Sequence, residues 1–267
     1  LAAALAASAA LVLLLIGISF PGSGFARAAP AAPQACVAGP HSGTLTGTQT
    51  WCLADSPHQL TGNVVVPDGD TLTIEPGVTV QADDGRALLV EGDLEALGTT
   101  ATPITFTSSV DSGSYQWAGI GFAGGTGHLR HATVRYAGDG NDVSTGVFNN
   151  GYYRSALAVR DGTLRLDDVT VRDVAGGDYD HGLLVDDSTV VITDTLFTGI
   201  GNGGDFDVAV RVNGPDTELT MSGCTFTGNT RDRVRLQYGA MMGHDTTLYA
   251  QPDLEGYELP ADFTVPT

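Results

Sequence analysis

The sequence predicts an all-β protein that folds as a right-handed parallel β-helix, a solenoid of about seven coils. Three observations favour this fold: short strands of period two, turns rich in Gly, Pro and Asp between them, and similar segments at coil-length intervals. No long helical pattern follows the N-terminal region of the 267-residue chain. An antiparallel sandwich would explain the strands and turns, but it would not predict aligned columns.

One complete coil is visible in the stretch NVVVPDGDTLTIEPGVTV, from Asn63 to Val80. Three apolar-alternating runs are separated by turns at Asp68-Gly69 and Pro76-Gly77. Gly accepts a positive φ and Pro fixes a turn, so these dipeptides suit the corners of a coil. The three runs then form three faces, whose alternate Val, Leu and Ile side chains point inward.

Later coils repeat this arrangement in aligned segments. The segments of one column are LRHATVRYAG (Leu129–Gly138), LRLDDVTVRD (Leu164–Asp173), VVITDTLFTG (Val190–Gly199) and LTMSGCTFTG (Leu219–Gly228), with PITFTS (Pro103–Ser108) as a shorter member. Val134, Val171, Phe197 and Phe226 recur at roughly 26 to 35 residues, so we expect them to stack in one inward column. The segments ALAVRD, GLLVDD, VAVRVN and VRLQY form a second column, with Val159, Val185 and Val210 expected as vertical neighbours.

The two ends of the chain are predicted to lie outside the solenoid, which we place at residues 51–253. Residues 1–28 resemble a signal peptide, with an apolar run and a small-x-small cleavage site, although a membrane anchor is the alternative. Residues 29–50 are a Pro/Ala/Gly-rich linker, and Cys36 and Cys52 are candidates for a disulfide that ties it down. Glu255–Thr267 echoes Ser56–Asp68, which predicts that residues 254–267 start a second unit in a longer repeat protein; the alternative is a coincidental terminal strand.

The block from Trp51 to Phe122, with SPHQLTGNVVVPDGDTLTIEPGVTV, LLVEGDLEALGTTATPITFTS and QWAGIGF, resembles bacterial secreted parallel β-helix repeat proteins of the pectin-lyase-like superfamily. The resemblance implies an exported β-helix. Members of this superfamily include polysaccharide lyases, hydrolases and epimerases, and also adhesins without chemistry. The resemblance therefore leaves the activity open.

The formal charge of −19 excludes a typical nucleic-acid-binding protein. All twelve basic residues are Arg, and no basic stripe that could follow a phosphate backbone is present. We expect no nucleic-acid partner, and no membrane contact after cleavage of the signal peptide.

Acidic loops are the best candidates for a metal site. GGDYDHG and GGDFD are separated by one coil length, so Asp178 and Asp205, and likewise Asp180 and Asp207, are expected to be vertical neighbours. Neighbouring carboxylates that fold inward would favour a bound Ca²⁺, whereas open loops would leave them solvated. Both readings remain open, and no other cofactor is expected.

Two further groups could contact a polysaccharide. Asp178, Asp180, His181 and Arg172 are the candidates for acid–base chemistry on a sugar, against the alternative of a loop with a purely structural role. Arg160, Asp186 and Arg211 are expected to alternate as a salt-bridge ladder on the outside, and Arg135 and Arg172 to share a column. Tyr152, Tyr153 and Arg154, in a long insertion, are the candidates for ligand binding.

The preferred hypothesis is a non-catalytic module of a secreted or cell-surface protein, which acts as a structural, adhesive or glycan-contacting scaffold. Its expected partner is an extracellular polysaccharide or a cell-surface glycan. The alternative hypothesis is a carbohydrate-active enzyme, either a polysaccharide lyase or a glycoside hydrolase, that acts on the outer face of the β-helix.

Overall fold

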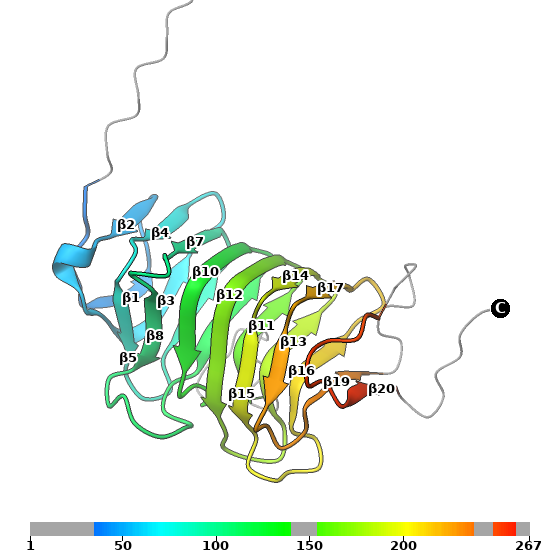
Figure 1. Cartoon of the computed structure of the whole chain (residues 1–267). Coiled ribbons are helices and arrows are strands. Elements are labelled where there is room, and N and C mark those ends of the chain that lie inside the picture. Colours follow the sequence, from blue (N-terminus) through cyan, green and yellow to red (C-terminus); the bar gives the residue numbers. More distant parts are fainter. Residues whose placement is uncertain (1–34, 140–153, 238–247, 260–267) are drawn as a thin grey trace, which may run out of the picture. The chain divides into compact units, whose positions relative to one another are not determined.

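The structure, a computed structural model, describes residues 35–139, 154–237 and 248–259, and these residues form a parallel β-helix (Figure 1). Every strand pairing in the described part of the chain is parallel, and each coil contributes strands to three faces. The predicted fold class is therefore confirmed. One 3₁₀ turn, Leu53–Asp55, interrupts the strands near the N-terminal end.

We name the three faces A, B and C. Face A contains β1 (His41–Thr44), the end of β3 (His58–Val66), β6 (Ala87–Val90), β9 (Gly119–Ala123), β11 (Arg154–Arg160), β13 (Asp180–Asp186), β16 (Val208–Asn213), β19 (Arg233–Leu236) and β20 (Gly256–Glu258). Face B contains β2 (Gln49–Trp51), β4 (Thr71–Ile74), β7 (Asp93–Leu97), the first parts of β10 (Thr126–Arg135) and β12 (Thr163–Val174), β14 (Thr189–Thr193) and β17 (Glu218–Ser222). Face C contains the start of β3, β5 (Thr79–Ala82), β8 (Ile104–Ser108), the second parts of β10 and β12, β15 (Leu196–Ile200) and β18 (Thr225–Thr227).

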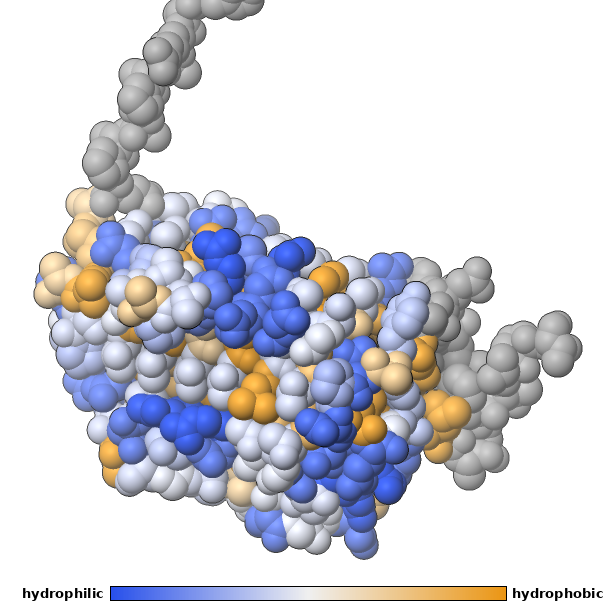
Figure 2. All heavy atoms as spheres, viewed as in Figure 1, coloured by the Kyte–Doolittle hydropathy of each residue, from blue (hydrophilic) through white to orange (hydrophobic). Residues whose placement is uncertain are grey.

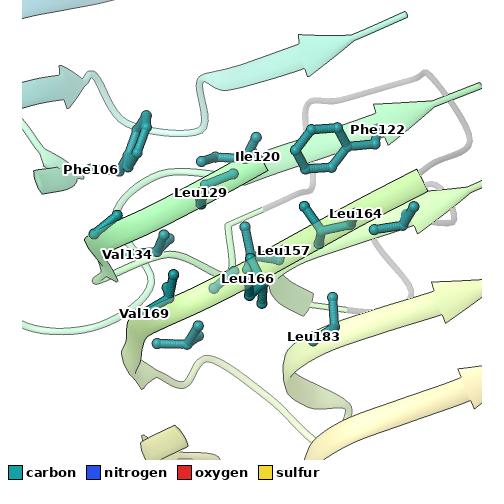
Figure 3. Close-up of a cluster of buried hydrophobic side chains, with 14 of the residues drawn as sticks. Phe106, Ile120, Phe122, Leu129, Val134, Leu157, Leu164, Leu166, Val169 and Leu183 are labelled. Carbon is teal, nitrogen blue, oxygen red and sulfur yellow. The ribbon is translucent and has the colours of Figure 1, made fainter. Parts of the chain in front are cut away.

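Inward side chains stack in columns and form one continuous core. On face C, the column expected from the sequence is present, because Val134 pairs with Val171, Val171 with Phe197, and Phe197 with Phe226. The rings of Phe197 and Phe226 lie parallel, with their centroids 5.3 Å apart. Figure 3 shows the middle of the core, which Leu, Ile, Val and Phe side chains from all three faces fill. Since each side chain contacts the coils above and below it, the strand register is fixed by packing.

Gly127 interrupts a column of larger residues on face B, between Leu94 and Leu164. A Cβ atom at this position would collide with the ring of Phe122. The aromatic ring therefore fills the volume that the glycine leaves, and the core stays closed at this coil.

The solenoid begins earlier than predicted. Residues 29–50 were expected to form a linker, but β1 and the first two residues of β2 lie within this range, and these strands pair with β3 and β4. The strand pattern is hard to see there, because Gly and Thr dominate and only the first residue of β1 is buried. The predicted disulfide between Cys36 and Cys52 is present and ties the segment to the first coil.

The core is closed at each end by polar contacts. At the N-terminal end, the Trp51 ring stacks on His41 and His58, and His41 Nε2 lies 3.0 Å from His58 Nδ1. Burial, with a smaller contribution from His58, lowers the pKa of His41 to about 4. At the other end, the Gln251 side chain accepts a hydrogen bond from the amide of Cys224, whose thiol is free and buried.

Only part of the segment that was predicted to start a second unit, residues 254–267, lies within the described residues. The sequence echo aligns Tyr257 with His58, but β20 extends face A, by pairing with β19, whereas His58 lies on face C. Residues 260–267 lie outside the described residues.

In one predicted column the register of the strand at Val210 was wrong by two residues. Val159 pairs with Val185, but Val185 pairs with Val212 and not with Val210. A slip of two residues keeps every side chain on its own side of the strand, so the alternation in VAVRVN cannot distinguish the two registers. As a result Asp186 lies beside Asn213, and Arg211 lies beside Leu184.

Only the first half of the predicted salt-bridge ladder therefore forms. Arg160 binds Asp186 at 2.8 Å, at the outside of face A. Arg211 is instead buried, and its guanidinium donates to Asn213 and Gln237.

Candidate functional site: the stacked loops between faces C and A

The loops that connect face C to face A, together with the first residues of the face A strands that follow them, contain most of the predicted site residues that the structure describes. We call residues 109–118, 175–179, 201–207 and 228–232 the stacked loops. Asp180 is the first residue of β13, directly after one of these loops, and Asp207 is the last residue of the next loop. They lie one coil apart, as predicted, because the Asp180 amide donates to Asp207 Oδ1 at 3.0 Å.

Both buried carboxylates hold the backbone of their own loop. Asp180 Oδ2 accepts hydrogen bonds from the amides of Gly176 and Gly177, at 2.9 and 3.0 Å. Asp207 Oδ2 accepts from the amides of Asn202 and Gly204, at 3.0 and 2.7 Å. Each carboxylate thereby closes a Gly-rich turn, which explains why the sequence GGD-aromatic-D occurs in two successive coils.

The environments of the two carboxylates differ in one respect. Asp180 Oδ1 is buried and has no hydrogen-bond partner among the described residues. Burial raises the pKa of Asp180 to about 6; the two Gly amides oppose this change, and the negative charge of Asp207 adds to it. A proton on this carboxyl group is therefore retained to a higher pH than usual.

The outer aspartates of the pair of loops point away from this buried centre. Asp178 is exposed, and Asp205 is exposed and forms an ion pair with Arg231 at 3.2 Å. The described residues contain no group of three or more His, Cys, Asp or Glu side chains that could hold a metal. Three of the four buried carboxylate oxygens already accept N–H groups, so a Ca²⁺ ion would have to displace these contacts.

His181 is enclosed, in contrast to the exposed loop residue expected from the sequence. It is wholly buried and lies beside Ser155 and Val208 on face A. Burial lowers the pKa of His181 to about 3, and the charge of Arg211 acts in the same direction. A neutral, enclosed imidazole does not fit direct proton exchange with an extracellular polysaccharide.

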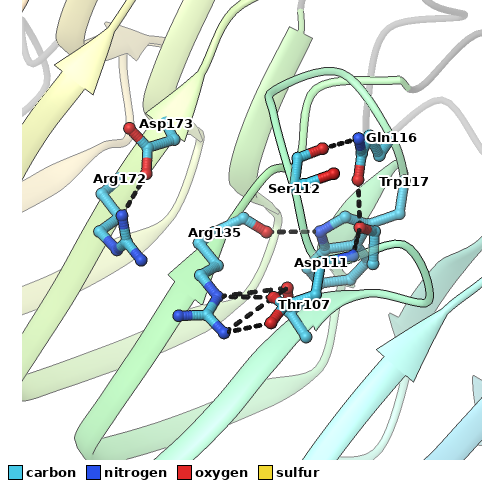
Figure 4. A network of polar contacts seen from close by, with 9 residues as sticks. Thr107, Asp111, Ser112, Gln116, Trp117, Arg135, Arg172 and Asp173 are labelled. Atoms are coloured by element: carbon cyan, nitrogen blue, oxygen red, sulfur yellow. Dashed lines mark hydrogen bonds and ion pairs between the residues drawn. The ribbon is translucent and has the colours of Figure 1, made fainter.

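Arg135 and Arg172 share a column, as predicted, and their like charges are neutralised by neighbours (Figure 4). The Arg135 guanidinium binds both oxygens of the Asp111 carboxylate at 2.8 to 2.9 Å, and Arg172 pairs with Asp173. Both guanidinium groups also lie over the Tyr136 ring, 5.4 and 5.5 Å from its centroid. These contacts make Arg172 a member of a structural network at the outside of face C.

Aromatic rings and arginines continue this pattern along the stacked loops. The rings of Tyr179 and Phe206 stack with their centroids 4.5 Å apart, and Arg235 lies over Phe206 at 5.3 Å. Arg154, a predicted ligand-binding residue, lies over the Tyr115 ring at 5.2 Å. Tyr152 and Tyr153, the other two, lie outside the described residues.

Sequence reasoning missed these axial stacks, although a signal was present. Tyr179 and Phe206 occupy equivalent positions in GGDYD and GGDFD, which recur at the interval of one coil. Such a repeat predicts ring-on-ring contact once the coil length is known.

A comparison with known protein families agrees with the parallel β-helix that the structure shows in the N-terminal half of the chain. Residues 43–147 match the family model described as a pectate-lyase-like beta helix domain. The matched segment begins in β1 and continues beyond β10, and the match confirms the resemblance that the sequence indicated. No curated protein and no solved structure matches the chain. In the described part of the chain, no helix has the length and apolarity required to cross a membrane.

Proposed function

We propose that the β-helix is a non-catalytic scaffold of a secreted or cell-surface protein, and that its outer faces contact glycans. One observation carries this proposal: the side chains best suited to acid–base chemistry have structural roles instead. Asp180 and Asp207 fasten loop amides, and His181 is enclosed in face A. A glycosidase needs two carboxyl groups that face the sugar, and a lyase needs an accessible base.

The exposed polar groups suit a neutral glycan better than a charged one. On face B, Asp167 accepts hydrogen bonds from His128, Arg165 and Thr193 across three coils. These contacts lower the pKa of Asp167 to about 2 against an opposing effect of burial, so the carboxylate stays ionised. Paired Arg and Asp side chains offer both donors and acceptors to sugar hydroxyls, while the formal charge of −19 repels polyanions.

The distribution of polarity on the surface is compatible with this proposal. The face of the molecule in Figure 2 has hydrophilic patches separated by pale and hydrophobic areas. Flat parallel strands repeat such groups at about 4.8 Å, which gives an extended polymer several equivalent contacts.

Export is supported by two features. Leu11–Phe20 is an apolar run of signal-peptide type, and the Cys36–Cys52 disulfide suits an oxidising compartment. Expression of the full coding sequence in a secreting host, followed by N-terminal sequencing of the exported product, tests this part of the proposal. Cleavage near residue 28 is expected, and retention in the cytoplasm would contradict it.

The alternative function is a carbohydrate-active enzyme, which the match to a pectate-lyase-like family model favours. In that case Arg154 and Arg172, which are partly exposed beside tyrosine rings, would neutralise a sugar carboxylate.

One experiment separates the two functions. The protein is incubated with neutral and acidic polysaccharides, and unsaturated products, new reducing ends and retardation in affinity gels are measured. Retardation by a neutral polysaccharide without product formation is expected. Turnover of any polysaccharide that Arg172→Ala abolishes, while the exposed control Arg130→Ala preserves it, would establish the enzyme instead.

A further inference from the structure

A hollow of about 180 Å³ lies at the corner between faces B and C, away from the stacked loops. It spans three successive coils, from the loop between β7 and β8 to the corners of β10 and β12. Its lining consists of Thr100, Pro103, His131, Ala132, Thr133, Asp168 and Thr170. By volume it holds about six water molecules, which is too small for a large ligand and suits one small ring.

His131 and Asp168 occupy the same corner position in neighbouring coils. The flanking pairs Arg130–Asp167 and Ala132–Val169 fix this register. Both residues have a positive φ, 43° for His131 and 52° for Asp168. This conformation directs both side chains to the outside, and His131 Nδ1 lies 2.8 Å from Asp168 Oδ2.

The loop Thr99–Pro103 forms the wall of the hollow. In the next two coils a single corner residue joins face B to face C, whereas this coil has additional residues between β7 and β8. The loop is closed on itself, because Thr99 and Thr102 exchange backbone hydrogen bonds of 3.1 to 3.2 Å and their hydroxyl groups lie 2.7 Å apart. The wall is therefore preformed, which lowers the entropic cost of binding.

The lining selects the chemistry of the ligand. Thr100, Thr133 and Thr170 belong to the lining, and a threonine hydroxyl group can donate and accept hydrogen bonds, while Pro103 and Ala132 add apolar side chains. His131 and Asp168 are the ionisable side chains of this lining, and they contact each other at 2.8 Å, so the hollow offers no unpartnered ionisable group to a charged ligand. A single carboxylate is too few for a Ca²⁺ site.

We propose that this hollow binds one ring of a neutral sugar. Hydroxyl groups of the ring would bond to the threonines and to the His131–Asp168 pair, while its apolar face would lie against Pro103. This proposal rests on the proposed glycan contact and assigns that contact a place.

Titration with methyl glycosides of glucose, galactose, mannose and N-acetylglucosamine, observed by NMR of the threonine methyl groups, tests the proposal. At least one neutral glycoside is expected to shift the Thr133 and Thr170 signals saturably, and galacturonate to shift them less. Thr133→Val and Asp168→Asn are expected to weaken binding about fivefold, as the loss of one hydrogen bond requires. The controls Thr198→Val and Asp194→Asn, on later coils outside the hollow, are expected to leave affinity unchanged.

The outcomes distinguish this proposal from the broader one. The sugar site would be overturned if no neutral glycoside shifts the threonine signals saturably, or if Thr133→Val and Asp168→Asn bind the glycoside as tightly as the wild type does. A preference of the wild type for galacturonate would overturn it as well. If Thr133→Val nevertheless remains retarded by a neutral polysaccharide as strongly as the wild type, the scaffold contacts glycan through another surface. If the wild type is not retarded by any polysaccharide, the proposed glycan contact itself fails.

Discussion

Asp180→Asn is expected to remove a pH dependence of stability that one carboxyl group introduces. Burial raises the pKa of Asp180 from 3.8 to about 6. Between these values the folded protein holds a proton that the unfolded chain has released. The free energy of unfolding therefore falls as the pH rises from about 4 to about 6, and the stabilising contribution is complete only below the lower value.

The size of this effect follows from the same pKa values. A change from 3.8 to about 6 corresponds to at most ~3 kcal/mol, because each tenfold change in proton affinity is worth about 1.4 kcal/mol. Asp180 adjoins a surface loop where solvent screens charges, so we expect its contribution to the free energy of unfolding to be about 1 to 2 kcal/mol. The asparagine oxygen can still accept from Gly176 and Gly177, so the loop should keep its conformation.

Urea unfolding at pH 4 and pH 7, followed by tryptophan fluorescence, measures this contribution. The stability of Asp180→Asn relative to the wild type should rise by about 1 to 2 kcal/mol between the two pH values. The control Asp178→Asn changes an exposed carboxylate and should show no such rise. If the free energy of unfolding changes equally between pH 4 and pH 7 in Asp180→Asn and in the wild type, the reasoning is refuted, because Asp180 would then ionise normally in the folded protein. Repetition with millimolar Ca²⁺ tests the calcium hypothesis, because a stabilisation present only in the wild type would support it.

Three further predictions concern the frame of the solenoid. Cys52→Ser should lower the free energy of unfolding by about 3 kcal/mol in non-reducing buffer, since the disulfide spans a separation of 16 residues, and a reducing agent should abolish the difference from the wild type. Phe226→Ala should cost about 3 to 5 kcal/mol because it leaves a cavity beside Phe197, whereas Phe206→Ala at a more exposed stack should cost less than half as much in the same urea assay. Gly92→Ala should destabilise by more than about 2 kcal/mol, because its methyl group would collide with the backbone oxygens of Pro67 and Asp70; a thermal melt equal to that of the wild type would contradict this geometry.

The fold was predictable because its main signal is periodic. Val134, Val171, Phe197 and Phe226 combine strand alternation with a coil-length interval, and together these two periods fix both the face and the neighbour. The register of Val210 was not predictable, since a two-residue slip preserves the alternation. Local pattern therefore determines which side chains are inside, and loop length determines which of them meet.

The candidate site was predictable in position but not in chemistry. The spacing of Asp180 and Asp207 placed them one coil apart, and the structure agrees. That their oxygens accept loop amides depends on the φ and ψ angles of Gly-rich turns, which the sequence leaves free. The hollow beside His131 was missed for a related reason: it depends on a left-handed corner residue and on a loop inserted in the preceding coil.

One pair of adjacent coils has the same offset on all three faces, so one coil could be removed from the solenoid without a change of register. Leu157 pairs with Leu183, Leu164 with Val190, and Thr170 with Leu196, so the same advance along the chain holds on all three faces. Excision of residues 163–188 would join Gly162 to Thr189 at a point of equal geometry. The shortened solenoid would keep the alignment of its remaining coils, and the distance between its two ends would decrease by one coil, about 4.8 Å.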